Sequence, residues 1–107
     1  MDELTLVARG QLEQARQSPH GRAARLLLHL NMLRQTLIAL TQGSVLGEHE
    51  APHAASVLVL TGSVQISTES GGMVSLAAGE LAEVPQERHD LMALADSVVL
   101  LTTVTGV

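Results

Sequence analysis

The sequence predicts a small all-β domain, an antiparallel barrel or sandwich, preceded by one short helix. Short apolar stretches follow one another at intervals set by glycines and a proline, which is typical of short strands joined by tight turns. Only the first segment has a helical period instead. The 107 residues leave room for one core, and because 46% of them are hydrophobic but none is Phe, Tyr or Trp, aliphatic side chains and Met must pack it.

The N-terminal segment is expected to form a helical arm over residues 1–20, next to a barrel domain formed by residues 21–107. Its apolar residues recur at the spacing of one helix face: Leu4, Ala8, Leu12 and Ala15. Asp2 and Glu3 favour a helix start, and Ser18-Pro19 favours its end. Gly10 costs about 1 kcal/mol relative to Ala, so we expect the helix to depend on packing against the barrel or a partner.

Strand signals begin at about Arg22. The first run contains two apolar stretches with a turn expected near Asn31, and short strands follow. The closing run, Ser97 to Thr105, is nearly continuous in Val, Leu and Thr, as expected for a strand covered on both faces. This run predicts that an edge of the barrel is buried in a homodimer.

The stretch from Gly43 to Gly62, GSVLGEHEAPHAASVLVLTG, resembles the first motif of the cupin family. That motif is a glycine, five residues, His-x-His, three or four residues, a Glu, six residues and a closing glycine. Gly43, His49 and Gly62 fall on this spacing, whereas Ala51 stands at the second His position and Ala55 at the Glu position. Two of the four ligand positions of metal-binding cupins are therefore apolar here.

The stretch from Gly79 to His89, GELAEVPQERH, resembles the second cupin motif. Gly79 and Pro85 match it, but the histidine comes one residue early and Asp90 stands at its expected place. On a strand, a shift of one residue turns a side chain to the other face, unless the turn at Pro85 is one residue shorter. The resemblance implies a small RmlC-like cupin, an all-β jelly-roll barrel (a double-stranded β-helix) with a short N-terminal helix.

Strand parity defines the candidate metal site. If His49 points into the barrel, His53 follows on the same face in an extended chain, although Pro52 can bend it. Together with His89, three imidazoles would suit one divalent Zn, Fe, Ni or Mn ion. The alternative is that His49 is buried and hydrogen-bonded, His53 is solvated and His89 caps a turn.

Without a complete metal site, the barrel interior is the candidate ligand site. His49, His89, Ala51, Ala55 and Val57 are expected to line it, and a modest apolar or mixed ligand would fit. At the barrel mouth, the Arg34 guanidinium is placed to bind a carboxylate or phosphate.

Composition excludes several chemistries. The chain has no Cys, no Lys and no aromatic ring except His, which excludes thiolate and Schiff-base catalysis and the His-Tyr acid-base pair of sugar-epimerising cupins. A net charge of -5 without a basic cluster argues against nucleic acid. No apolar stretch approaches a membrane span and no signal-peptide pattern occurs, so a bacterial-type cytoplasmic protein is expected.

Three functions compete at this point. The first is a cupin that binds a small molecule without catalysis. The second is a metal-dependent oxygenase or isomerase that uses His49, His89 and His53, and whether the chain is an enzyme stays open. The third is a structural or regulatory homodimer.

Overall fold

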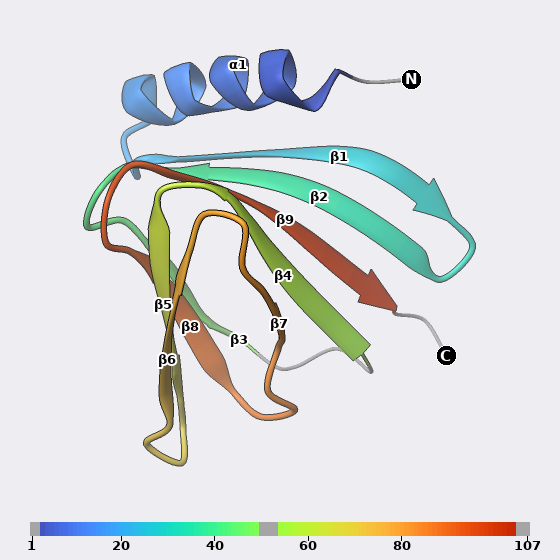
Figure 1. Ribbon diagram of the computed structural model, residues 1–107, viewed down its shortest axis with the longest axis vertical. Helices are drawn as coiled ribbons and strands as arrows, with labels where there is room; N and C mark the ends of the chain where they lie inside the picture. The colour runs from blue at the N-terminus through green and yellow to red at the C-terminus, as the bar shows by residue number, and fades with distance from the viewer. Residues whose placement is uncertain (1–2, 50–53, 105–107) are drawn as a thin grey trace.

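The computed structural model describes residues 3–49 and 54–104. Over these residues the chain forms one helix and nine strands, coloured in chain order in Figure 1. Their bounds are α1 Leu4–Gln17, β1 Arg22–Leu30, β2 Leu33–Leu40, β3 Val45–His49, β4 Ala54–Thr61, β5 Ser63–Thr68, β6 Met73–Ala77, β7 Leu81–Glu83, β8 His89–Ala93 and β9 Ser97–Val104.

The strands form two antiparallel sheets whose inner faces enclose one core. One sheet has the order β1-β2-β9-β4-β7, and the other has the order β3-β8-β5-β6. Aliphatic side chains pack this core, among them the fully buried Leu40, Val59 and Ile66. This is the predicted all-β antiparallel barrel with a short N-terminal helix. The turn expected near Asn31 is also confirmed, because Asn31 has a φ of 51° and joins β1 to β2.

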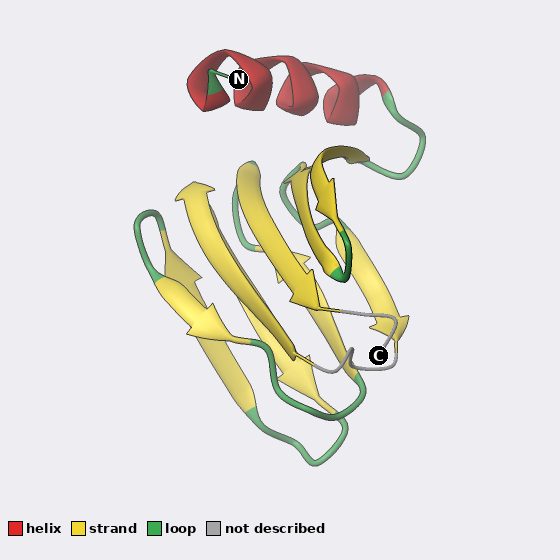
Figure 2. Cartoon of the chain, turned by 90° about the vertical axis from the view of Figure 1, so that its right-hand side faces the viewer, coloured by secondary structure: helices red, strands yellow, loops and turns green. Residues whose placement is uncertain are grey.

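The helix packs on the outer face of the five-stranded sheet, mainly over β1 and β2 (Figure 2). Glu3 caps its start by accepting a hydrogen bond from the backbone N–H of Thr5 at 3.0 Å. Ala8 and Ala15 are buried against Leu37 and Val98 of the sheet, so small side chains set a close approach. No helix in the described parts of the chain is both long and apolar enough to cross a membrane.

The prediction that the closing run marks an edge of the barrel is wrong. β9 is the central strand of the five-stranded sheet, hydrogen-bonded to β2 on one side and β4 on the other. Its residues are apolar on both faces because Val99 faces the barrel core while Val98 faces the helix. The apolar pattern was interpreted correctly as a doubly covered strand, but the cover comes from this chain's own helix.

Candidate functional site

The candidate site lies at one end of the barrel, which we call the His89 end. It consists of residues at matching ends of five strands: Arg34, Ala55, Thr68, His89 and Thr103, with the backbone of His49 beside them. The opposite end, which we call the Gly62 end, carries the turns at Gly43, Gly62 and Ala95-Asp96.

His89 points into the barrel and is almost fully buried. Along β8, His89, Leu91 and Ala93 are buried, whereas Asp90 and Met92 between them are half-buried. His89 itself is 5% exposed. The motif's histidine therefore keeps an inward position although it comes one residue early, so the turn after Pro85 is in effect one residue shorter.

A backbone carbonyl orients the His89 ring. Its Nδ1 lies 2.8 Å from the carbonyl oxygen of Glu87. Because a carbonyl only accepts hydrogen bonds, Nδ1 carries the proton, and in the neutral ring Nε2 holds the lone pair. The ring thus has one fixed tautomer and one fixed direction, which suits a group that binds a ligand or a metal ion.

A bulge in β3 brings His49 opposite His89. Leu46 pairs with Leu91 and His49 pairs with His89, so three steps along β3 match two along β8. Without the extra residue, Glu48 would stand opposite His89. The backbone register thus pairs the two motif histidines across neighbouring strands. The His49 side chain, Ala51 and His53 lie outside the described part of the structure.

Arg34 belongs to the inner face of the sheet at the same end. It pairs with Thr103, and Thr103 pairs with Ala55 on the other side. Residues directly opposite one another in antiparallel strands share a face, and Ala55 packs against the barrel core. Arg34 itself is exposed, and it supplies a cation at the rim.

The deeper interior is filled by side chains. Val57, predicted as a ligand-lining residue, is 1% exposed and packs within the aliphatic cluster. The inward-facing residues that stay partly accessible lie nearer the His89 end. They are the half-buried Ala55, Leu101 and Thr103. Within the barrel, a ligand would therefore contact the described residues at the His89 end.

Two polar residues at this end were missed by the sequence interpretation. Thr68 pairs with His89 in the four-stranded sheet, and Thr103 stands between Arg34 and Ala55. Both lie two positions from an inward-facing residue, Ile66 for the first and Leu101 for the second. Because every second side chain of a strand lies on the same face, counting in steps of two from the core residues would have identified both threonines.

The Glu87 carboxylate, two residues before His89, is hydrogen-bonded to a neighbouring turn. Its Oε1 accepts a hydrogen bond from the backbone N–H of Ser70 at 2.8 Å, and this bond holds the pKa of Glu87 below its ordinary value. A hollow of about 270 Å³ lies beside it, bordered by Thr68 and Pro85. The carboxylate therefore stays charged at the rim and ties the turn after β5 to the turn before β8.

No group of three His, Asp or Glu side chains within the described residues could hold a metal ion. The set of His49, His53 and His89 includes side chains outside those residues, so the three-imidazole site stays a prediction. Its only described member, His89, has the geometry of a candidate ligand.

No family model matches the chain, and no curated protein matches it. Solved structures do. A cupin superfamily protein from Desulfitobacterium hafniense is 17% identical to this chain, with a TM-score of 0.73. The match covers 79% of this chain and 78% of that protein. An RmlC-like cupin from Shewanella frigidimarina is 19% identical with a TM-score of 0.72, covering 81% of this chain and 78% of its own.

The chain has the cupin fold. This confirms what the two motifs predicted, despite their missing ligand positions. A conserved protein of unknown function from Streptococcus pyogenes also matches: it is 25% identical, with a TM-score of 0.74, and the match covers 84% of this chain and 79% of that protein. These similarities establish the cupin fold and leave the activity to be argued from the site.

Proposed function

We propose that this cupin binds a small molecule at the His89 end of its barrel. The observation that carries the proposal is the inward, 5% exposed His89, whose Nδ1 is bonded to the Glu87 carbonyl oxygen at 2.8 Å. A buried polar ring that is fixed in one tautomer is the kind of polar group that binding sites use.

The ligand chemistry follows from the neighbours of His89. Arg34 offers a guanidinium at the same end of the barrel, on the inner face of the opposite sheet, and it suits a carboxylate. Thr103 offers a hydroxyl group, whereas the Thr68 hydroxyl accepts from the Gly72 N–H at 2.9 Å within its own turn, and the core below offers only aliphatic contact. We therefore infer a small carboxylic acid whose carbonyl or hydroxyl group pairs with His89.

Metal-dependent catalysis is the second candidate, and the pairing of His49 with His89 favours it. Two histidines opposite each other on neighbouring strands can supply two of the ligands of a Zn, Fe, Ni or Mn site. With His53 as a third ligand, the bound metal would act as a Lewis acid or activate dioxygen, as an isomerase or an oxygenase requires.

Elemental analysis of protein purified without chelator separates the two candidates. Three variants accompany the wild type: His49→Ala, His89→Asn and, as the control, His20→Ala in the exposed turn between α1 and β1, which lies at the Gly62 end. His89→Asn keeps an amide donor for the Glu87 carbonyl but removes Nε2. Binding without metal predicts negligible metal in every form. Stoichiometric metal that is lost in His49→Ala and His89→Asn but kept in His20→Ala would replace the first proposal with the second.

A thermal-shift screen of small carboxylic acids then tests binding directly, because a ligand that binds only the native state raises the melting temperature. We expect a hit whose shift disappears in His89→Asn and falls in Arg34→Gln, but persists in His20→Ala. A shift that is equal in all four proteins would place the ligand elsewhere and contradict the proposal.

A homodimer is also proposed, with β1 as its contact. β1 is an edge strand, and its Leu26, Leu28 and Leu30 are 53%, 43% and 59% exposed. An apolar edge of this length invites pairing with a second copy. Light scattering during gel filtration should give twice the mass of one chain, and a monomer that is unchanged up to high concentration would exclude this contact.

A further inference from the structure

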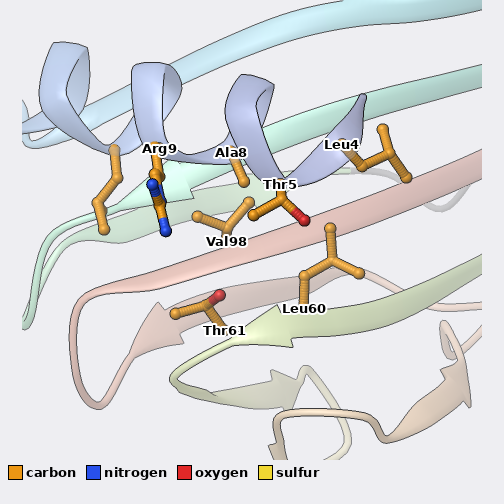
Figure 3. A pocket seen from close by; sticks show the side chains of 8 residues that line it. Leu4, Thr5, Ala8, Arg9, Leu60, Thr61 and Val98 are labelled. Atoms are coloured by element: carbon orange, nitrogen blue, oxygen red, sulfur yellow. The ribbon is translucent and has the colours of Figure 1, made fainter. Parts of the chain in front are cut away.

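A second concave surface lies far from the His89 end, between the helix and the outer face of the five-stranded sheet. It is a groove of about 460 Å³ bordered by α1, β4 and β9 (Figure 3). Its volume is within the range of sites that hold small organic ligands, roughly 300–1,000 Å³. No residue of the groove belongs to the candidate site described above.

The groove exists because the helix covers only part of the sheet. α1 packs mainly on β1 and β2, and its C-terminal turn is tied to the β8–β9 turn by an ion pair of 3.2 Å between Arg16 and Asp96. The outer face of β4 lies beyond the helix (Figure 1). Ala8 is too short to fill the angle between helix and sheet, so a trough remains over Val98 and Leu60.

The walls of the groove are aliphatic. Ala8 and Val98 are 8% and 1% exposed, and Leu12 and Leu60 are half-buried beside them. Leu4, 37% exposed, extends the helix side of the groove (Figure 3). An apolar ligand body placed here would remove these leucines from water.

One cation faces this apolar surface. In Figure 3 the Arg9 side chain descends from the helix toward the strand that carries Thr61. Glu13 lies one turn further along the helix, but its carboxylate pairs with Arg16 at 3.3 Å. The described residues place no carboxylate in an ion pair with Arg9.

The hydroxyl groups of the groove add hydrogen-bonding capacity near the guanidinium. Thr5 from the helix and Thr61 from β4 both border it. A carboxylate accepts two N–H bonds from one guanidinium and a further bond from a hydroxyl. Charge and shape together therefore specify a ligand with an anionic head and an aliphatic body.

We propose that the groove binds an amphipathic monocarboxylate, of the medium-chain fatty acid type, with its head on Arg9 and its chain along Leu12, Leu60 and Val98. This site is independent of the one at the His89 end and does not rest on the proposed function. The two sites lie on opposite faces of the five-stranded sheet, since Val98 belongs to the cluster under the helix whereas Ala55 packs in the barrel.

Titration of isotope-labelled protein with decanoate, followed by NMR, tests the proposal. We expect saturable shifts of the Leu60, Thr61 and Val98 signals, and Arg9→Gln should weaken decanoate binding about tenfold because one charge-assisted pair is lost. Decanol should bind wild type and Arg9→Gln equally. Arg34→Gln is the matched control: it removes an exposed arginine at the His89 end and should leave decanoate binding in the groove unchanged.

A second variant guards against an indirect effect on the helix. Thr5→Phe places a ring in the groove from an exposed helix position, and it should abolish the shifts without lowering the melting temperature. Absence of saturable shifts at Leu60, Thr61 and Val98 up to millimolar decanoate would overturn the proposal. So would unchanged affinity in Arg9→Gln, or shifts confined to His89 and Thr68, which would assign the fatty acid to the other site.

Discussion

The Gly62 end and the His89 end of the barrel are both built from the two motifs, but different kinds of residue build them. At the Gly62 end the chain closes through its backbone: the N–H of Gly43 donates to the Ala93 carbonyl at 2.8 Å, and the N–H of Ala93 donates to the Ser44 carbonyl at 3.0 Å. At the His89 end, side chains dominate the inner surface, with buried His89, half-buried Thr103 and exposed Arg34.

This difference separates folding from function within one motif. The motif glycines act where the chain turns tightly, so their replacement should change stability. The histidine position and its polar neighbours lie beyond the aliphatic core, so their replacement should change binding first. The loss of family ligands at Ala51 and Ala55 is compatible with an intact barrel for the same reason.

Gly62→Ala should give the largest loss of stability. Gly62 has a φ of +83°, and a Cβ there would overlap the Asp96 carbonyl oxygen and the Ser97 Oγ and lie 2.9 Å from the Ser97 Cα. Backbone strain and overlap together should lower the free energy of unfolding by about 3 kcal/mol or more. Urea unfolding measures this loss.

Gly71→Ala is the matched control for that experiment. Gly71 also has a positive φ, +95°, but a Cβ there would meet no atom within 4 Å. Only the conformational cost remains, so we expect a loss of about 1 kcal/mol. Equal losses in the two variants would show that close packing at Gly62 contributes nothing, and the contrast between the two ends would fail.

A pair of hydroxyl deletions on the same strand compares the ends directly. Ser97, at the start of β9, is 0% exposed, and its Oγ donates to the backbone carbonyl of Ser63 at 3.0 Å or of Ala95 at 2.7 Å while accepting from the N–H of Ser63 at 3.1 Å. Ser97→Ala leaves buried backbone groups without this partner and should cost about 1–3 kcal/mol.

Thr103→Val replaces a hydroxyl by a methyl group of similar size, near the other end of β9. Thr103 is half-buried and lies on the inner face at the His89 end, so the expected change is within about 0.5 kcal/mol. Thermal and urea unfolding of both variants give the comparison. A larger loss from Thr103→Val than from Ser97→Ala would mean that the His89 end also stabilises the fold.

Much of the fold followed from local sequence signals. The helix, the turn at Asn31 and the strand bounded by Ser97 are set by short-range periodicity and turn chemistry, which a single sequence displays directly. The motif glycines were equally informative, because only a residue without a Cβ adopts a φ near +83° so close to a neighbouring carbonyl.

The site was harder to predict because the register of strand pairing determines which side chains meet there. The bulge in β3 that sets His49 opposite His89, and the row that joins Arg34 to Thr103 and Ala55, depend on pairings between distant segments. For the same reason β9 was assigned to an edge: its apolar pattern reveals that both faces are covered, but not that a helix provides the cover. The groove at Arg9 had no sequence signal, because it depends on which part of the outer sheet surface the helix leaves uncovered.

The smallest expected effect concerns pH and the link between helix and barrel. Two hydrogen bonds lower the pKa of Asp96 from its ordinary 3.8. The larger effect comes from the Gln42 N–H, which donates to Asp96 Oδ1 at 2.8 Å, and the smaller from the Arg16 guanidinium at 3.2 Å. A carboxylate whose pKa is lower in the folded chain stabilises that chain above its unfolded pKa, and this contribution is lost as the pH falls through the folded value. Asp96→Asn should therefore lower the melting temperature slightly at neutral pH, and the gap to wild type should close below pH 3.8.

Arg16→Gln identifies which contact produces this pH dependence. Because the Gln42 N–H is the larger cause of the lowered pKa and the Arg16 pair is exposed, Arg16→Gln should keep most of the acid-dependent loss of stability that wild type shows. If Arg16→Gln instead behaves like Asp96→Asn across the whole pH range, the ion pair to the helix is the main contact of Asp96. The Gly62 end would then be stabilised by the docked helix as well as by its own turns.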